Sequence, residues 1–228
     1  AGKTLFAVKE FAIELNIWKL LGSEMTVEGI YLEQPEIFIK VLEDGTANYD
    51  IAVSSDEESP AAEEEEASDF AFAIEYWQLT NGHIIYDDAT LPTYVELTEV
   101  NHTGGGNFTL SVFDLTTTTQ AFINQLSYDG ISYLEKRSVD MALVLNMDFD
   151  QMKFTFRENK TLINEFAFSL DGWLAMPDED IAMDLTFSSG KNSFKSLISL
   201  IPAIYAEDFD DLETAGDLVF EGAVKGVY

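Results

Sequence analysis

The residues best able to do chemistry gather in one short stretch of the chain, between Leu79 and Pro92. This stretch brings His83, Asp87 and Asp88 within six positions, and the whole chain has only two histidines. Imidazole and carboxylate side chains are the usual parts of a metal site or of an acid–base pair. The pattern of the same stretch also predicts a β-strand, so its polar residues could lie on the strand and at its end without any chemical role.

Strand geometry argues against catalysis by this group. On a strand, His83 and Asp87 share one face, whereas Asp88 points to the other. The two carboxylates therefore diverge, which is wrong for a shared metal or a carboxylate dyad. Side chains four residues apart on a strand lie ~13 Å apart, too far to hold one metal ion together. We expect a structural role instead, with a turn at Asn81-Gly82 and a strand that ends at the two aspartates.

Two further stretches hold residue types that bind ligands in other proteins. The glycines at 104–106 could cradle a phosphate, but a strand follows them instead of a helix with an anion-binding N-terminus. The acidic run at 208–213 lacks the spacing and the glycine of a calcium loop. We expect a flexible turn at the first and a solvated loop at the second. No nucleophile motif occurs, so we expect no catalytic residue, no metal and no cofactor.

The composition excludes several classes of partner. The chain has 228 residues, of which 42 are acidic and 12 are basic, and its net charge is −30. Nucleic acids and anionic membrane surfaces are bound through clustered Lys and Arg, so neither is expected as a partner. The chain has no cysteine, which excludes disulfides and zinc–thiolate sites. It lacks a run of ~20 apolar residues that could span a bilayer. Both ends are abrupt, and we expect a fragment of a longer protein.

Hydrophobic alternation predicts a β meander in the second half of the chain. The most regular alternation runs through 139–149 and returns in strands expected at 152–156, 166–170 and 181–187. Short turns, for example at 158–160, would join them in antiparallel order. The candidate apolar groove or core face consists of Val139, Met141, Leu143, Leu145, Met147, Phe149, Phe154, Phe156, Phe166, Phe168 and Leu170. A packed core is the plainer interpretation of each residue, and a surface that lines a lipid groove is the sharper one.

Two short helices are expected to interrupt this β pattern. Residues 193–202 place apolar side chains at helical spacing, with Ser193 as a possible N-cap. A further turn of helix is expected near 119–125. The fold class is therefore mainly β, with extended, curved antiparallel sheets and short helices packed on one side.

An acidic run at 54–69 divides the chain. It holds eight acidic residues, no basic residue and no large apolar side chain, so it cannot bury a core. We expect a mobile linker or loop there. An N-terminal β unit at 1–53 would precede it, and a β-rich region at 70–228 would continue the sheet.

One segment of the chain is repeated. Residues 27–40 align with residues 74–87 at an offset of 47 positions. The apolar positions correspond, as Leu32 does with Leu79, whereas most charged residues differ between the copies, as Lys40 does from Asp87. Each copy is expected to be a strand, a polar turn and a second strand. Repetition of one such unit suggests a sheet extended by addition.

The order of these segments resembles the AsmA-like family of bacterial envelope proteins. An alternating strand and the turn WKLL (18–21) precede VEGIYLEQPEIFIKVLEDGTANYDI (27–51), where a Pro, a D-G and an Asn stand as they do in that family. The acidic spacer follows, and then comes LTNGHIIYDDA (79–89). Residues 194–226 match a short amphipathic helix followed by a glycine-spaced segment. The resemblance touches most of the chain.

The resemblance implies a location and a role. AsmA-like proteins are anchored in the inner membrane, and their long β-rich part lies in the periplasm. They are similar to TamB-like bridge-like lipid-transfer proteins, in which a sheet forms an apolar groove. The family implies outer-membrane biogenesis, phospholipid acyl chains and other envelope proteins as partners, and no catalytic residues. Its membrane anchor is absent here, so any anchoring would come from a segment outside this chain.

Two other classes stay open. The first is a ligand-binding or sugar-binding β-sandwich, in which Trp77 and Trp173 would gather in an exposed cleft beside carboxylates. The second is a purely scaffolding module of the envelope, with no ligand.

Overall fold

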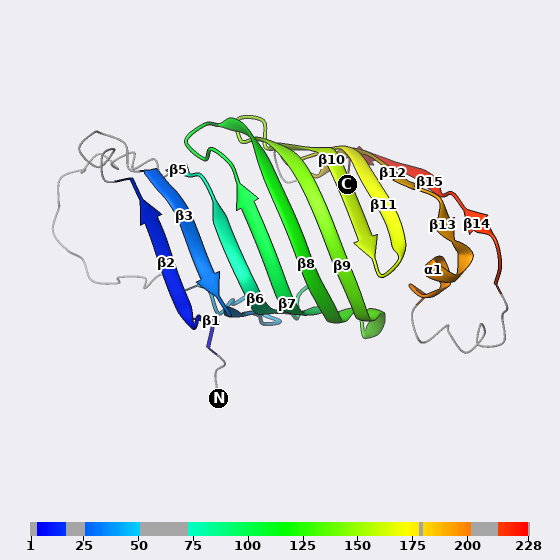
Figure 1. The fold of residues 1–228 in the computed structure, drawn as a ribbon, viewed down its shortest axis with the longest axis horizontal. Coiled ribbons are helices and arrows are strands. Elements are labelled where there is room, and N and C mark those ends of the chain that lie inside the picture. The colour runs from blue at the N-terminus through cyan, green and yellow to red at the C-terminus, as the bar shows by residue number, and fades with distance from the viewer. Residues whose placement is uncertain (1–3, 17–25, 51–72, 178–179, 202–213, 228) are drawn as a thin grey trace.

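The structure is a computed structural model that describes residues 4–16, 26–50, 73–177, 180–201 and 214–227. Most of them form one sheet of 13 strands, which extends across the whole molecule in Figure 1. A two-stranded ribbon and one α-helix are the other elements of the described part. The expected mainly β fold is confirmed. The turn expected at 18–21 and the acidic runs at 54–69 and 208–213 lie outside the described residues.

The strands follow the chain in order across most of the sheet. From β6 to β12 each strand pairs antiparallel with the next, and β15 then pairs with β12. The strands of the large sheet are β1 (Phe6–Ala7), β2 (Glu10–Leu15), β3 (Thr26–Glu33), β4 (Glu36–Val41), β5 (Ala73–Ile74), β6 (Trp77–Asp88), β7 (Thr93–Gly105), β8 (Val112–Tyr128), β9 (Ile131–Asp148), β10 (Lys153–Ile163), β11 (Phe166–Ala175), β12 (Ala182–Ser189) and β15 (Glu221–Val227). Strands from both sides of the acidic run thus belong to one sheet.

The helix α1 (Phe194–Ile198) lies beside the ribbon of β13 (Asn192–Ser193) and β14 (Asp217–Leu218), at one end of the sheet (Figure 1). The Ser193 hydroxyl accepts a hydrogen bond from the Ser196 N–H at 3.0 Å, so the expected N-cap is confirmed. The turn of helix expected near 119–125 is wrong, because these residues lie inside β8. Pairing with β7 on one side and β9 on the other outweighs their weak helical pattern.

The expected meander of four strands is confirmed in β9 to β12, but the chain does not turn at 158–160. That stretch is a bulge inside β10, where Glu158 has a φ of 43°. The Asn159 side chain accepts the Leu170 N–H at 2.6 Å and donates to the Leu170 carbonyl. It thereby replaces the ladder bonds that the bulge removes. The chain reverses six residues later than expected, at Asn164, which has a φ of 50°.

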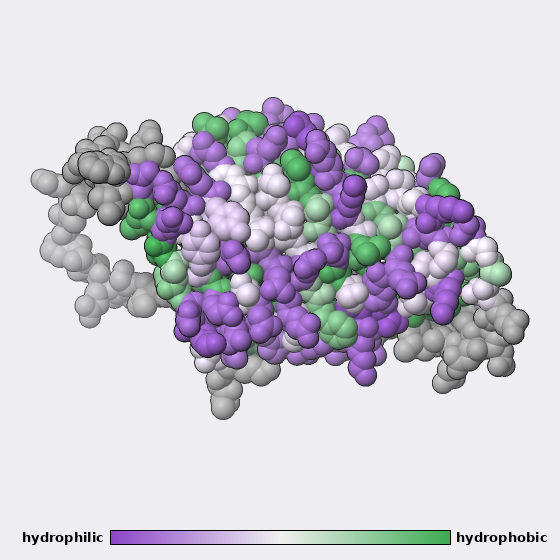
Figure 2. Space-filling model, viewed as in Figure 1, coloured by the Kyte–Doolittle hydropathy of each residue, from purple (hydrophilic) through white to green (hydrophobic). Residues whose placement is uncertain are grey.

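The register gives the sheet one apolar and one polar face. A row of three neighbours across β8, β9 and β10 defines the apolar face: Leu115, Leu145 and Phe156. The adjacent row defines the polar face: Asp114, Asn146 and Thr155. Figure 2 shows the polar face, where hydrophilic and neutral residues predominate and apolar patches are small. The alternation expected from the sequence is therefore carried across the sheet.

The core of this sheet is thin. Among the described residues only nine hydrophobic side chains besides Pro35 are buried, and they are spread over several strands. A second sheet packed on the apolar face would bury most of that face. Large apolar side chains of the face stay exposed instead, for example Phe11 (56%) and Phe149 (42%). The described residues form a single layer with much of one apolar surface open.

The internal repeat is a parallel pairing of strands in register. Both β3 and β4 run parallel to β6, and β3 also runs parallel to β5. Leu32 lies beside Leu79, and Ile37 lies beside Ile84. Each residue thus pairs with its own counterpart 47 positions later. The repeat does extend the sheet by addition, but the sheet is mixed at this point instead of antiparallel throughout.

The turn expected at Asn81-Gly82 is also wrong. Strand β6 continues through both residues, and Asn81 has a φ of 53° in a bulge. The equivalent residue of the first copy, Gln34, has a φ of 50°. The His83 N–H donates to the Pro35 carbonyl at 2.8 Å, so the two copies stay hydrogen-bonded past their bulges. A chain reversal here would break that ladder.

Candidate functional site

The polar cluster that first suggested chemistry is split between the two faces of the sheet. His83 and Asp87 lie on the polar face and Asp88 on the apolar face, as strand geometry predicts. His83 Nε2 lies 3.0 Å from a carboxylate oxygen of Glu96. Asp87 forms an ion pair with the Lys40 ammonium at 2.5 Å. His83 and Asp87 therefore have separate partners and share no site.

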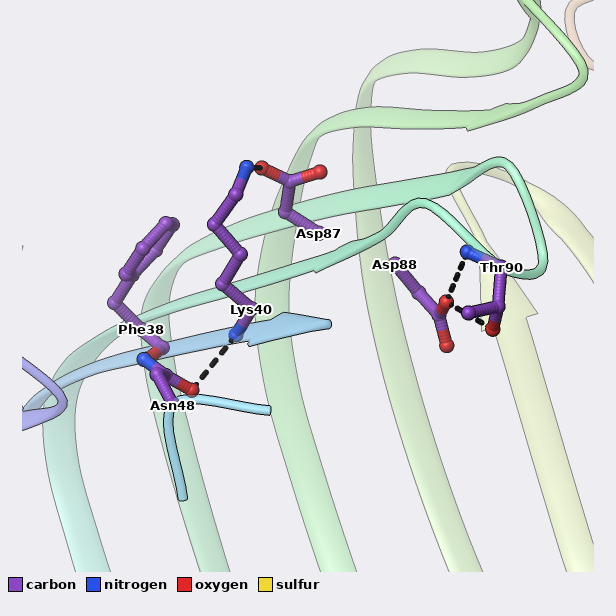
Figure 3. Close-up of polar contacts among 6 residues, drawn as sticks. All are labelled: Phe38, Lys40, Asn48, Asp87, Asp88 and Thr90. Atoms are coloured by element: carbon purple, nitrogen blue, oxygen red, sulfur yellow. Dashed lines mark hydrogen bonds and ion pairs between the residues drawn. The ribbon is translucent and has the colours of Figure 1, made fainter. Parts of the chain in front are cut away.

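Figure 3 shows the Lys40–Asp87 ion pair, which joins equivalent positions of the two repeat copies. The Asn48 side chain lies along the edge of β4. It accepts the Lys40 N–H at 2.9 Å and donates to the Phe38 carbonyl at 2.6 Å. Asn48, the Asn of the family-like segment, thus adds a pair of hydrogen bonds along the edge of β4.

Asp88 is the most strongly bonded of the three residues. Its side chain is only 5% exposed and accepts bonds from the Thr90 and Tyr86 hydroxyls at 2.6 Å each. The Thr90 and Leu91 N–H groups donate to it at 2.8 and 3.1 Å. These bonds, led by that of Thr90, favour the carboxylate and lower the pKa of Asp88 to about 2. Asp88 therefore closes the turn after β6, and its expected structural role is confirmed.

Asp88 should make stability depend on pH in acid. Its folded pKa of about 2 lies below the ordinary value of 3.8. Its contribution is therefore complete above about pH 4 and is lost as the pH falls through the folded pKa. Asp88→Asn should lower the free energy of unfolding at neutral pH. It should also make that free energy decrease less steeply between about pH 4 and pH 2. Urea unfolding at a series of pH values would measure this. Asp171→Asn on the polar face is the control, and equal flattening there would contradict the assignment.

The structure brings the predicted apolar residues together on one face. All eleven lie on the apolar face across β9, β10 and β11, or directly after β9 in the case of Phe149. Phe166 is buried, Phe149 is exposed, and the other nine are half-buried. The predicted set is therefore a continuous surface that its neighbours cover only in part.

A row of aromatic rings extends this surface from β6 to β10. Neighbouring ring centres lie 5.9 Å apart from Trp77 to Phe108, 4.8 Å from Phe108 to Phe113, and 5.9 Å from Phe113 to Phe149. The last step, from Phe149 to Phe154, is 6.4 Å. Sequence reasoning missed the first three members, although the alternation in VFDL after position 111 is a signal for Phe113. The apolar face thus reaches well beyond the predicted set.

Hollows of the sheet lie mainly on its polar side. One of about 480 Å³ is lined by Asp140, Leu162 and Ser169, among others. Another of about 450 Å³ has a mixed lining of polar residues, including Thr103 and Thr118, and apolar ones, including Leu79. Phe168 contributes to the first of these hollows and Met141 to the second, but most of the predicted apolar residues line neither. The predicted set is therefore best described as an open face, and not as the wall of a groove.

The two tryptophans that would mark a sugar-binding cleft lie on opposite faces. Trp77 pairs with Gly104 on the apolar face, and a Cβ at Gly104 would lie 2.0 Å from the indole. The glycine at this position makes room for the ring at the end of β7, in place of the expected flexible turn. Trp173 lies on the polar face, with the Lys153 ammonium 4.5 Å from its ring centre. The two rings form no common cleft, and one large sheet is not a sandwich.

Comparisons with known proteins found no matching family model, no matching curated protein and no matching solved structure. Among the described residues no group of three or more His, Cys, Asp or Glu is placed to hold a metal ion. No helix in the described ranges is long and apolar enough to cross a membrane. The open apolar face is the feature from which a function can be argued.

Proposed function

We propose that this chain is a non-enzymatic, periplasmic segment of an envelope protein that resembles the AsmA-like family. Its apolar face would bind the acyl chains of phospholipids and support their movement during outer-membrane assembly. The longer protein would supply the anchor in the inner membrane. The observation that carries the proposal is the partly open apolar face, with its eleven predicted residues and its aromatic row.

The chemistry of the face suits acyl chains. Burial of each CH₂ group of a lipid contributes about 0.8 kcal/mol, and the contact needs no directional partner. Met141 and Met147 are flexible and adapt to chains of different shape, while flat rings such as Phe149 and Phe154 offer broad contact. A monomeric soluble protein seldom exposes so continuous an apolar surface without a ligand or partner.

The charge of the chain is compatible with this role. A net charge of −30 keeps a protein with an open apolar face soluble and discourages contact between its copies. It also opposes docking on the anionic surface of a membrane. Binding would therefore depend on acyl chains that reach the face, and not on charge attraction to a bilayer.

Binding of a pyrene-labelled phosphatidylcholine, followed by fluorescence, would test the proposal. Leu145 lies on the apolar face and the adjacent Asn146 on the polar face. Leu145→Glu should weaken binding at least about tenfold, because it places a charge among the acyl contacts. Asn146→Glu adds the same charge to the opposite face and should leave binding unchanged. Phe149→Glu, at an exposed position, repeats the test with less risk to folding.

Two outcomes would argue for a scaffolding module instead. One is a wild-type chain that binds no lipid while circular dichroism shows it folded. The other is equal weakening by Leu145→Glu and Asn146→Glu. Either result would remove the acyl chains from the apolar face.

A further inference from the structure

Arg137 is a cation on the apolar face. The register pairs it with Ile123, which is only 6% exposed, and places it in step with Val139 two residues later. From this position β9 continues along the same face through Met141 and Met147. A charged residue is unexpected there, because a guanidinium is costly to remove from water unless it is paired.

Within the described part of the chain, the guanidinium of Arg137 has only backbone partners. Its Nη1 donates to the carbonyl oxygens of Glu135 at 2.7 Å and Lys136 at 3.3 Å. Its Nε is buried and has no hydrogen-bond partner among the residues that the structure describes. A guanidinium has five N–H donors, so capacity remains for an anion.

No carboxylate among the described residues forms an ion pair with Arg137. The only other arginine, Arg157, lies on the polar face and pairs with Asp114 at 3.5 Å. The charge of Arg137 is therefore open to a partner from outside the chain.

We propose that Arg137 binds the phosphate of a lipid whose acyl chains lie along the apolar face. This inference rests on the proposed function and names the lipid class, namely lipids that carry a phosphate. Arginine recognises phosphate through paired, charge-assisted hydrogen bonds. Along β9, the ten residue steps from Arg137 to Met147 span ~33 Å. That length exceeds the ~15 Å depth of one leaflet of a bilayer, so an acyl chain can lie between Arg137 and the aromatic row.

The same features favour a lipid phosphate over free phosphate. At physiological ionic strength charges act over about 8 Å, so the acidic surface repels small anions near the chain. A lipid gains apolar contact with the face in addition to the bond with Arg137. Free phosphate gains only the bond.

Calorimetry with short-chain lipids would test this inference. The probes are dihexanoyl phosphatidylcholine, dihexanoylglycerol without a phosphate, and inorganic phosphate. The wild-type chain should bind the phospholipid about tenfold tighter than the diacylglycerol. Arg137→Gln should remove this preference and bind the diacylglycerol as the wild type does. Arg137→Lys should keep part of the preference, and the matched control Arg157→Gln should keep all of it.

Three results would overturn the inference. If Arg137→Gln keeps the preference, another group recognises the phosphate. If inorganic phosphate binds as tightly as the phospholipid, the site is not a lipid site. If both lipids bind equally to the wild type, the acyl part of the proposed function stands and the role of Arg137 does not. Failure of both lipids to bind would instead remove the proposed function itself, and this inference with it.

Discussion

Gly172→Ala is expected to destabilise the sheet by at least about 3 kcal/mol. Gly172 in β11 has a φ of 114°, a conformation that residues with a side chain rarely adopt. A Cβ there would lie 2.0 Å from the Asp184 carbonyl oxygen on the neighbouring strand. Backbone atoms cannot move aside as a flexible side chain can, so β11 and β12 would have to separate locally. The free energy of unfolding in urea would measure the loss.

Gly190→Ala is the matched control for this prediction. Gly190 lies at the end of β12, has no positive φ, and a Cβ there would meet no atom within 4 Å. Its replacement should change stability by less than about 0.5 kcal/mol. Similar losses at the two glycines would show that β11 and β12 are not paired at Gly172.

Phe113→Ala is expected to lower the free energy of unfolding by about 3 kcal/mol. Phe113 lies at the centre of the aromatic row, is only 6% exposed, and packs edge-on against Phe108 with ring centres 4.8 Å apart. Its removal would leave a cavity, and a single layer has no facing layer whose side chains could fill it. Urea unfolding would detect the change through the midpoint, with an unchanged slope.

Phe149→Ala provides the comparison within the same row. Phe149 is 42% exposed, so its removal forfeits less buried area, and we expect a loss of about 1 kcal/mol. This difference tests whether the apolar face is open. A loss at Phe149 as large as that at Phe113 would mean that another layer covers the row in solution.

The faces of the sheet could be predicted from the sequence because side chains alternate with a period of two on any strand. Val139 and Phe149 share a face for that reason, whatever the pairing around them. The strand β4 (Glu36–Val41) lies where the repeat predicts the second strand of its first copy. Alternation does not tell parallel from antiparallel pairing, however. The direction of β3 and β4 along β6 could not be derived from it.

The bulges could not be predicted for a different reason. Asn81 is followed by Gly82, a pair typical of hairpin turns, and Glu158 is followed by other polar residues. Both look like chain reversals, yet both are single residues at positive φ inside strands that stay paired. Whether such a stretch forms a bulge or a turn depends on which distant strands pair with it. The local sequence carries no information about that pairing. The position of Arg137 on the apolar face was also hard to predict, because its neighbours Glu135, Lys136 and Ser138 make the segment look polar.

The parallel pairing of the repeat has a consequence for how such a sheet can lengthen. When a copied unit lies in register on the original, every residue becomes the neighbour of its own duplicate. Identical apolar residues tolerate this, and Ile37 does lie beside Ile84. A faithful copy would also put one lysine against another at Lys40, where Asp87 now forms an ion pair with it. Growth by duplication thus favours divergence where a copied charge would lie against its own duplicate, as at Lys40 and Asp87, since like charges side by side repel.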